Sequence, residues 1–195
     1  MILAPIVEGH GDAQAVPILL RRLLERIGFY SLRVAPPVRI PRDQMVREKE
    51  LSRAIKLASL RVEDFGAVII VLDSDDACPV ELAQSVSSAG EAAGAACPVV
   101  VISAQREYES IFLAAADSLA EVGLTKTGTP TIENPETIRG AKERIRSILI
   151  DGRYRETQEQ ARLTARIDLD EALRLRWLRK LDKELRLIVN SFPTV

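Results

Sequence analysis

An apolar run that ends in a cluster of carboxylates constrains the fold of this chain most strongly. Residues 67–72 read Ala-Val-Ile-Ile-Val-Leu, and Asp73, Ser74, Asp75 and Asp76 follow directly. A continuous run of β-branched and aliphatic residues predicts a strand buried on both faces, as in a parallel sheet. If the extended conformation continues, Asp73 and Asp75 point to the same side, because side chains alternate along a strand. We therefore expect the chemistry of this protein at the acidic end of this strand.

The N-terminal segment repeats the same arrangement. Residues 2–7 are apolar, Glu8 and Gly9 follow, and apolar residues then recur at helical spacing from Val16 to Ile27. We expect Asp12 to cap this helix, with Pro17 removing one early hydrogen bond and shifting the start toward Val16. Glu8 thus takes a position after its strand that is equivalent to the position of Asp73.

The rest of the chain alternates between strand and helix patterns. Further strands are expected at 32–35 and 98–103, with a loop that carries Arg39 and Arg42 after the first of them. Helices are expected over 51–58, 79–94, 108–119, 138–148 and 175–188, the fourth entered through Asn134-Pro135. This alternation predicts an α/β fold, with a mostly parallel central sheet and helices on both faces. We expect a single domain, with a core at 1–122 and a helical C-terminal extension at 123–195 packed on it.

A third acidic group follows the strand at 98–103, in the sequence Arg106-Glu107-Tyr108-Glu109. On a helix, Glu107 and Glu109 would diverge by about 200° around the axis, and one of them would face the site. In an extended turn, both would project the same way. The sequence leaves these two arrangements open.

Composition narrows the class of protein. With 47% hydrophobic and 28% charged residues, the 195-residue chain is expected to be an ordinary soluble globular protein, and it lacks an apolar run long enough for a membrane helix. No signal peptide is expected, and we therefore expect a cytoplasmic location. Cys78 and Cys97 form neither a disulfide framework nor a zinc site. The net charge of −1 gives no global attraction to nucleic acid, although a local basic surface is compatible with it.

The carboxylates predict a hard divalent cation if their strands are neighbours. The carboxyl ends of parallel strands share one sheet edge, which would bring Glu8 to Asp73 and Asp75. Oxygen ligands without a Cys/His cluster favour Mg²⁺ or Mn²⁺ over zinc. The alternative is that residues 73–76 merely cap the next helix, and that Glu8 is a surface loop residue. His10 is either an acid, base or phosphate contact, or a solvated loop residue.

The order of these motifs resembles the TOPRIM domain of topoisomerases, primases and OLD-type nucleases. Glu8-Gly9 with Asp12, and Asp73-x-Asp75 after a buried strand, carry that resemblance. The chain is more closely similar to the TOPRIM-like family called domain of unknown function 4276, through segments that span most of its length: Val7-Glu8-Gly9, 72–76, 106–109, 112–114 and 154–168. Members of that family often accompany an ATPase in bacterial anti-phage or restriction-like loci.

The resemblance implies a set of roles for residues of this sequence. Glu8, Asp73 and Asp75 would bind the metal, and Glu107 and Glu109 would form part of a second metal position. Auxiliary roles fall to four residues around them: Asp76, His10, Asp12 and Arg106. The expected function is Mg²⁺-dependent (or Mn²⁺-dependent) phosphoryl transfer, as a nuclease acting on DNA or RNA.

Two other functions stay open. The chain could be a non-catalytic or regulatory partner subunit of an ATPase, with the carboxylates serving regulation or stability. A DxD-bearing nucleotidyl or glycosyl transferase is less well supported, because no nucleotide-binding glycine pattern extends beyond Gly9-His10-Gly11.

Overall fold

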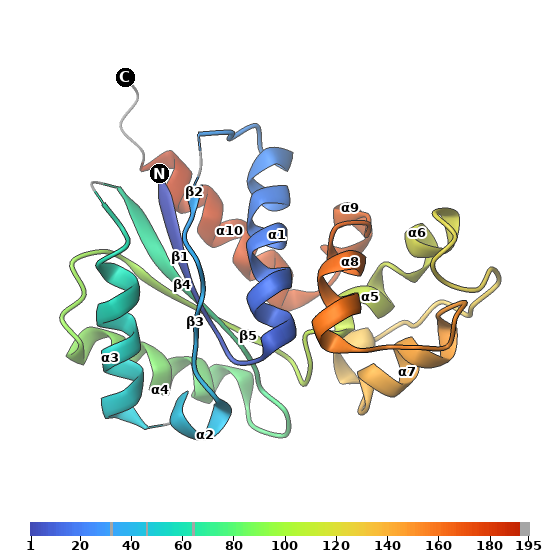
Figure 1. Cartoon of the computed structure of the whole chain (residues 1–195), viewed down its shortest axis with the longest axis horizontal. Helices are drawn as coiled ribbons and strands as arrows, with labels where there is room; N and C mark the ends of the chain where they lie inside the picture. The colour runs from blue at the N-terminus through green and yellow to red at the C-terminus, as the bar shows by residue number, and fades with distance from the viewer. Residues whose placement is uncertain (32, 46, 64, 192–195) are drawn as a thin grey trace.

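The computed structural model describes residues 1–31, 33–45, 47–63 and 65–191. Its centre is a parallel sheet with the strand order β2-β1-β4-β5, in which β3 also pairs with β1 (Figure 1). The strands are β1 (Ile2–Val7), β2 (Arg33–Val34), β3 (Val38–Arg39), β4 (Gly66–Asp73) and β5 (Val99–Ala104). The expected α/β class with a parallel sheet is confirmed. Strand β3 lies where a loop was expected, and Leu32 of the expected strand at 32–35 lies outside the described residues.

Strands β1 and β4 are adjacent and parallel along the whole length of β1. Their register runs from Ile2 opposite Gly66 to Val7 opposite Val71. Gly66 is required at the start of this pair, because a Cβ there would lie 1.8 Å from the carbonyl oxygen of Ile2. The two strands therefore end side by side, and Glu8 leaves the sheet next to the end of β4.

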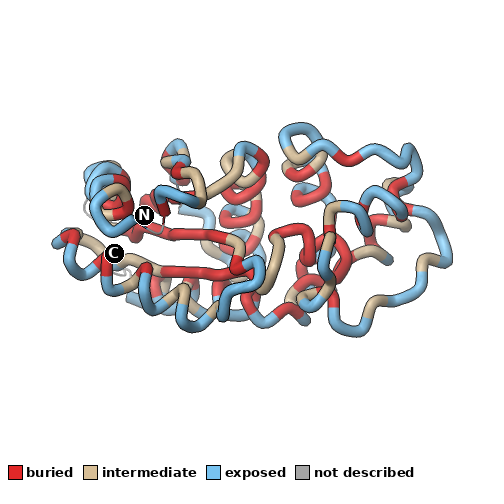
Figure 2. Tube along the Cα trace, turned by 90° about the horizontal axis from the view of Figure 1, so that it is seen from below, coloured by how far each residue is buried: buried red, intermediate tan, exposed pale blue. Residues whose placement is uncertain are grey.

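The two faces of the sheet carry separate hydrophobic clusters. On one face, side chains such as Ile6 and Ile70 pack with α3 (Glu48–Ser59) and α4 (Pro79–Ala92). On the other face, side chains such as Val7 and Val71 pack with α1 (His10–Arg26) and α10 (Arg176–Asn190). The sheet is thus the middle layer of three, and β1, β4 and most of β5 are buried (Figure 2).

Most of the remaining helices lie beside α1, on the far side from α3 (Figure 1). They are α5 (Ser110–Ala114), α6 (Ala116–Glu121), η1 (Pro135–Thr137), α7 (Ala141–Ile148), η2 (Glu156–Gln160), α8 (Ala161–Thr164) and α9 (Leu169–Ala172). A short helix, α2 (Arg42–Met45), lies in the segment expected to be a loop. Both η2, a π-helical turn, and α8 pack against α1. Among the described helices, none is long and apolar enough to cross a membrane.

Two helix starts differ from the predictions. Helix α1 begins at His10 after Gly9, and the Asp12 carboxylate accepts a hydrogen bond from the Gly9 N–H at 2.9 Å. Asp12 therefore lies in the first turn of α1 and is not its N-cap, and Pro17 lies inside the helix. In the second case, Pro135 opens only a 3₁₀ turn that ends at Thr137, and α7 begins after Gly140, which has a φ of 68°.

Candidate acidic site at the end of the sheet

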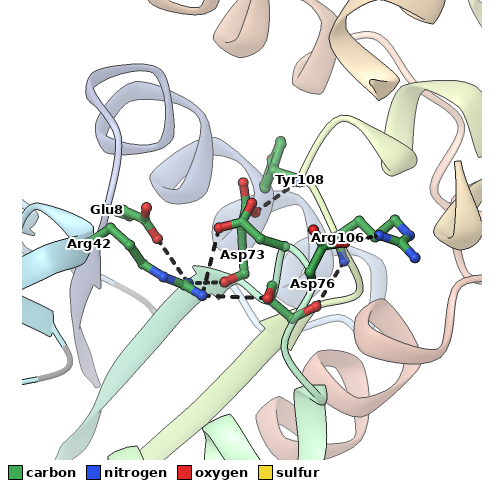
Figure 3. A network of polar contacts seen from close by, with 8 residues as sticks. Glu8, Arg42, Asp73, Asp76, Arg106 and Tyr108 are labelled. Carbon is green, nitrogen blue, oxygen red and sulfur yellow. Dashed lines mark hydrogen bonds and ion pairs between the residues drawn. The ribbon is translucent and has the colours of Figure 1, made fainter. Parts of the chain in front are cut away.

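Glu8 and Asp75 face a common arginine at the ends of β1 and β4. The Arg42 guanidinium lies 3.4 Å from a Glu8 carboxylate oxygen and 3.7 Å from an Asp75 carboxylate oxygen. It also donates to the backbone carbonyl of Asp73 (Figure 3). Arg42 comes from α2, so the loop after β3 supplies the positive charge that two neighbouring carboxylates require.

The backbone turns directly after Asp73, at the end of β4. Asp75 has a φ of 49°, so the extended conformation does not continue to this residue, and the condition under which Asp73 and Asp75 would point to the same side is not met. The Asp75 side chain is 60% exposed. The turn is held against the loop after β5, because the buried Ser74 hydroxyl accepts from the Arg106 N–H at 2.9 Å and the Asp75 N–H donates to the Arg106 carbonyl.

Asp76 lies at the surface between two arginines. Its Oδ1 is 2.7 Å from Arg106 and 2.9 Å from Arg139. The hydrogen bond from Arg106 and the charge of Arg139 hold the pKa of Asp76 below its usual value. We call Glu8, Asp75 and Asp76 the outer acidic group, since each of them faces at least one arginine.

Asp73 belongs to a second group of carboxylates that lies deeper. Its Oδ1 accepts from the Tyr108 N–H at 2.9 Å. Burial raises its pKa well above the usual value, and the charges of Asp12 and Glu109, with Glu8, raise it further. We call Asp12, Asp73 and Glu109 the inner acidic group.

Glu107 and Glu109 point to different parts of the molecule. The Glu107 carboxylate accepts from the backbone N–H groups of Gly140 and Ala141 at 3.1 and 3.2 Å, so it caps α7. Glu109 is 1% exposed, and its carboxylate accepts a 2.8 Å hydrogen bond from the Tyr154 hydroxyl. Burial raises the pKa of Glu109 to about 7. Of the two arrangements that the sequence left open, the structure has the divergent one, with Glu109 on the side of Asp73.

Asp12 joins the inner acidic group to the π-helical turn. Its second oxygen accepts from the Gln160 side-chain amide at 2.6 Å, and burial raises its pKa. Gln160 lies directly over Gly11, because a Cβ on that glycine would meet the Gln160 amide oxygen at 1.8 Å. Gly11 is therefore needed for this close packing, a use that the sequence pattern did not show.

One lysine faces the inner acidic group. Lys142, in the first turn of α7, forms an ion pair with Glu156 at 2.7 Å. Burial lowers the pKa of Lys142, but the charges of Glu109, Glu156 and Asp73 outweigh that effect and raise it above the usual value. Sequence reasoning missed Lys142 and Gln160. The matched segment 154–168 was the one signal that pointed toward this part of the chain.

The donors suit a hard cation, but their present arrangement is not a formed metal site. Among the residues that the structure describes, no three His, Cys, Asp or Glu side chains are placed to hold a metal ion together. Arg42 takes the place between Glu8 and Asp75 that a cation would need. The carboxylate oxygens fit Mg²⁺ or Mn²⁺ chemically, provided that Arg42 moves aside.

The other predicted residues lie around this site. His10 is exposed at the start of α1. Arg106 has a φ of 65°, and within the described structure its buried Nε has no hydrogen-bond partner. Cys78 is exposed and Cys97 is partly exposed, and both thiols are free.

Comparison with known proteins places this chain in a family whose function is undefined. Neither the curated proteins nor the solved structures gave a significant match. The model of one family, described as a domain of unknown function (DUF4276), matches residues 7–185. That match covers both strand ends, both acidic groups and most of the helical region after residue 122. The chain therefore belongs to the DUF4276 family.

Proposed function

We propose that this chain is a TOPRIM-like nuclease that uses Mg²⁺ or Mn²⁺ to hydrolyse phosphodiester bonds in DNA or RNA. The observation that carries the proposal is the adjacency of β1 and β4, which places Glu8 beside the end of the strand that bears Asp73. In open α/β sheets, ligands bind at this carboxyl edge. The motif resemblance adds the expectation that these two residues bind metal.

The charge balance of the inner acidic group supports a cation. Asp12, Asp73 and Glu109 all have raised pKa values, and Lys142 is the cation whose charge acts on all three. A divalent ion between Glu8 and Asp73 would lower the free energy of their charged forms. Glu109 and Asp12 suit a second position better than Glu107, which is bound to the backbone of α7.

The arginines around the site suit the negatively charged backbone of a nucleic acid. A bound ion would polarise the scissile phosphate and activate a water molecule. Arg106 and Arg139 now face the Asp76 carboxylate, and they can exchange it for a phosphate oxygen. Arg42, once released from Glu8, lies close enough to the same edge to contact a phosphate as well.

The test is cleavage of labelled single- and double-stranded DNA and RNA with Mn²⁺ or Mg²⁺. We expect Asp73→Asn to reduce cleavage by more than the roughly 10- to 100-fold typical of losing a group that only supports a metal ligand. The matched control is Asp117→Asn, at an exposed position of α6, which should cleave like the parent. Equal activity of the two variants, or no cleavage of any substrate, would refute the catalytic proposal.

One observation favours a second function, that of a regulatory subunit of an ATPase. Arg42 already neutralises Glu8 and Asp75, as expected of carboxylates that stabilise a fold. In that case the Glu8→Ala variant would keep the full function of the parent protein in cells, and it would still co-purify with the ATPase. Loss of function in Glu8→Ala with intact co-purification would favour catalysis.

A further inference from the structure

A cleft lies beside the carboxyl end of β5, at the free edge of the sheet. Strand β5 is the last strand of the sheet, and α4 and α10 pack against it from either side (Figure 1). The cleft has a volume of about 740 Å³. Its walls include Ala83 and Ser87 of α4, Ser103 of β5, and Arg176 and Lys180 of α10.

The backbone of β5 presents hydrogen-bonding groups to this edge. The Pro98 carbonyl accepts from Val68 of β4, and the Ala104 carbonyl accepts from Ser74 directly after β4. The even-numbered residues of β5 therefore turn their backbone groups toward the sheet. Alternate residues of a strand turn these groups in opposite directions, so Val99, Val101 and Ser103 present theirs to the free edge. Consistent with this, the Val101 carbonyl accepts from the Lys180 ammonium at 2.8 Å.

A buried hydroxyl suggests that this edge receives a ligand. Ser103 is 8% exposed, and its hydroxyl oxygen has no hydrogen-bond partner among the described residues. A buried hydroxyl without a partner costs free energy, which a bound group would recover. Lys180 covers one edge carbonyl, and a lysine at an edge strand opposes indiscriminate pairing, so an added strand must displace this ammonium.

We propose that this edge binds an extended segment of a partner protein as an added parallel or antiparallel strand, with an acidic side chain facing α10. A peptide N–H would replace the Lys180 ammonium on the Val101 carbonyl, and the peptide carboxylate would take up that ammonium. Arg176, exposed on the same wall, adds a second positive charge. Two carboxylates also line the cleft: Glu91 belongs to α4, and the Glu136 carboxylate is held at the start of α10 by the Arg176 and Trp177 N–H groups. Among the described residues, the positive charges of the cleft therefore come from the α10 wall alone, and the acidic side chain of the ligand faces that wall.

Other occupants fit this cleft less well. A nucleic-acid base needs an aromatic face, but Trp177 is 4% exposed, packs on Tyr108 and donates its Nε1–H to Ser110. A second copy of this chain, paired edge to edge about a two-fold axis, would bring Lys180 and Arg176 of both copies together. Like charges at such an interface oppose association.

The test uses a display library of random eight-residue peptides, selected against the full chain. We expect enrichment of sequences with β-branched residues at alternate positions and one Asp or Glu. Titration of a selected peptide into isotope-labelled protein should shift the amide signals of Val99, Val101 and Ser103. Enrichment of no β-type sequence, or shifts confined to other residues, would overturn the proposal.

Matched variants separate the cleft from its surroundings. Ser87→Tyr fills the cleft and should weaken the selected peptide at least tenfold, whereas Ser85→Tyr, exposed on α4 outside the cleft, should change binding less than twofold. Lys180→Glu should invert the preference, so that a peptide with Lys in place of its acidic residue binds more tightly. Circular dichroism melting checks that each variant folds. Unchanged preference in Lys180→Glu, or a dimer that the peptide does not dissociate, would contradict the proposed occupant.

Discussion

The outer and inner acidic groups lie at the same edge of the sheet, yet their carboxylates have different kinds of partner. Glu8, Asp75 and Asp76 face arginine side chains. The inner carboxylates accept from neutral groups instead: the Tyr108 N–H, the Gln160 amide and the Tyr154 hydroxyl. Proximity in the fold therefore does not give these carboxylates the same electrostatic environment.

The pKa values follow this difference. Arginine contacts lower the pKa of Asp76, whereas burial raises the pKa of all three inner carboxylates. Glu8 lies between the two cases, because burial raises its pKa while Arg42 opposes the change. The inner group thus holds protons more tightly than ordinary carboxylates, and a cation that binds there displaces them.

The largest expected effect is a pH-dependent loss of stability that originates at Glu109. Its pKa rises from 4.5 to about 7 on folding, so its share of stability is complete below pH 4.5 and is lost as the pH rises through about 7. At about 1.4 kcal/mol per pH unit between the two values, this loss is on the order of 3 kcal/mol. Glu109→Gln should remove it, as measured by urea unfolding between pH 4.5 and 8.5 without metal.

Glu107→Gln is the control for this prediction, since that side chain caps α7 and lies outside the inner group. Its unfolding free energy should keep the pH slope of the parent. If Glu109→Gln also keeps that slope, the contrast between the two acidic groups is wrong.

A smaller effect should follow from separating the inner group from the π-helical turn. A methyl group in Gly11→Ala would meet the Gln160 amide and the Glu156 carbonyl, so we expect a loss of about 1–3 kcal/mol in the free energy of unfolding. Gly90→Ala, in the interior of α4, is the matched control. There a Cβ meets nothing closer than 3.4 Å, and replacing a helical glycine should stabilise by about 0.5–1 kcal/mol. Destabilisation of similar size at both positions would contradict the close packing at Gly11.

The smallest effect on stability should come from the outer group. The ion pair of Arg42 with Glu8 is partly exposed, so Arg42→Met should cost at most about 1 kcal/mol. It should nevertheless raise the affinity for Mn²⁺ several-fold, because Glu8 and Asp75 lose their competing cation. Electron paramagnetic resonance titration measures the free Mn²⁺. Arg47→Met, which leaves the exposed Asp43 unpaired, should bind Mn²⁺ like the parent, and equal affinity in the two variants would exclude Arg42 as the competitor.

Local sequence patterns predicted most of the main strands and helices, but not the contacts between distant charges. They missed β3 and α2, and the expected helix at 108–119 is divided at Ala115 into α5 and α6. The apolar runs at β1 and β4 predicted two buried strands, and the parallel α/β class then predicted that Glu8 and Asp73 share an edge. The sequence did not predict the direction of the Asp75 side chain, because one backbone torsion at the turn determines it. The hydrogen bond between Asp12 and Gln160 joins residues 148 positions apart, and no periodicity encodes such a pair.

The central claim is that Glu8 and Asp73 bind a divalent cation together once Arg42 moves aside. A crystal structure of the protein soaked in Mn²⁺, with anomalous data, tests it directly. We predict an anomalous peak about 2.0–2.6 Å from carboxylate oxygens of both residues, with Arg42 turned away from Glu8. Arg42 still bridging Glu8 and Asp75, with no peak at this edge of the sheet, would contradict the claim.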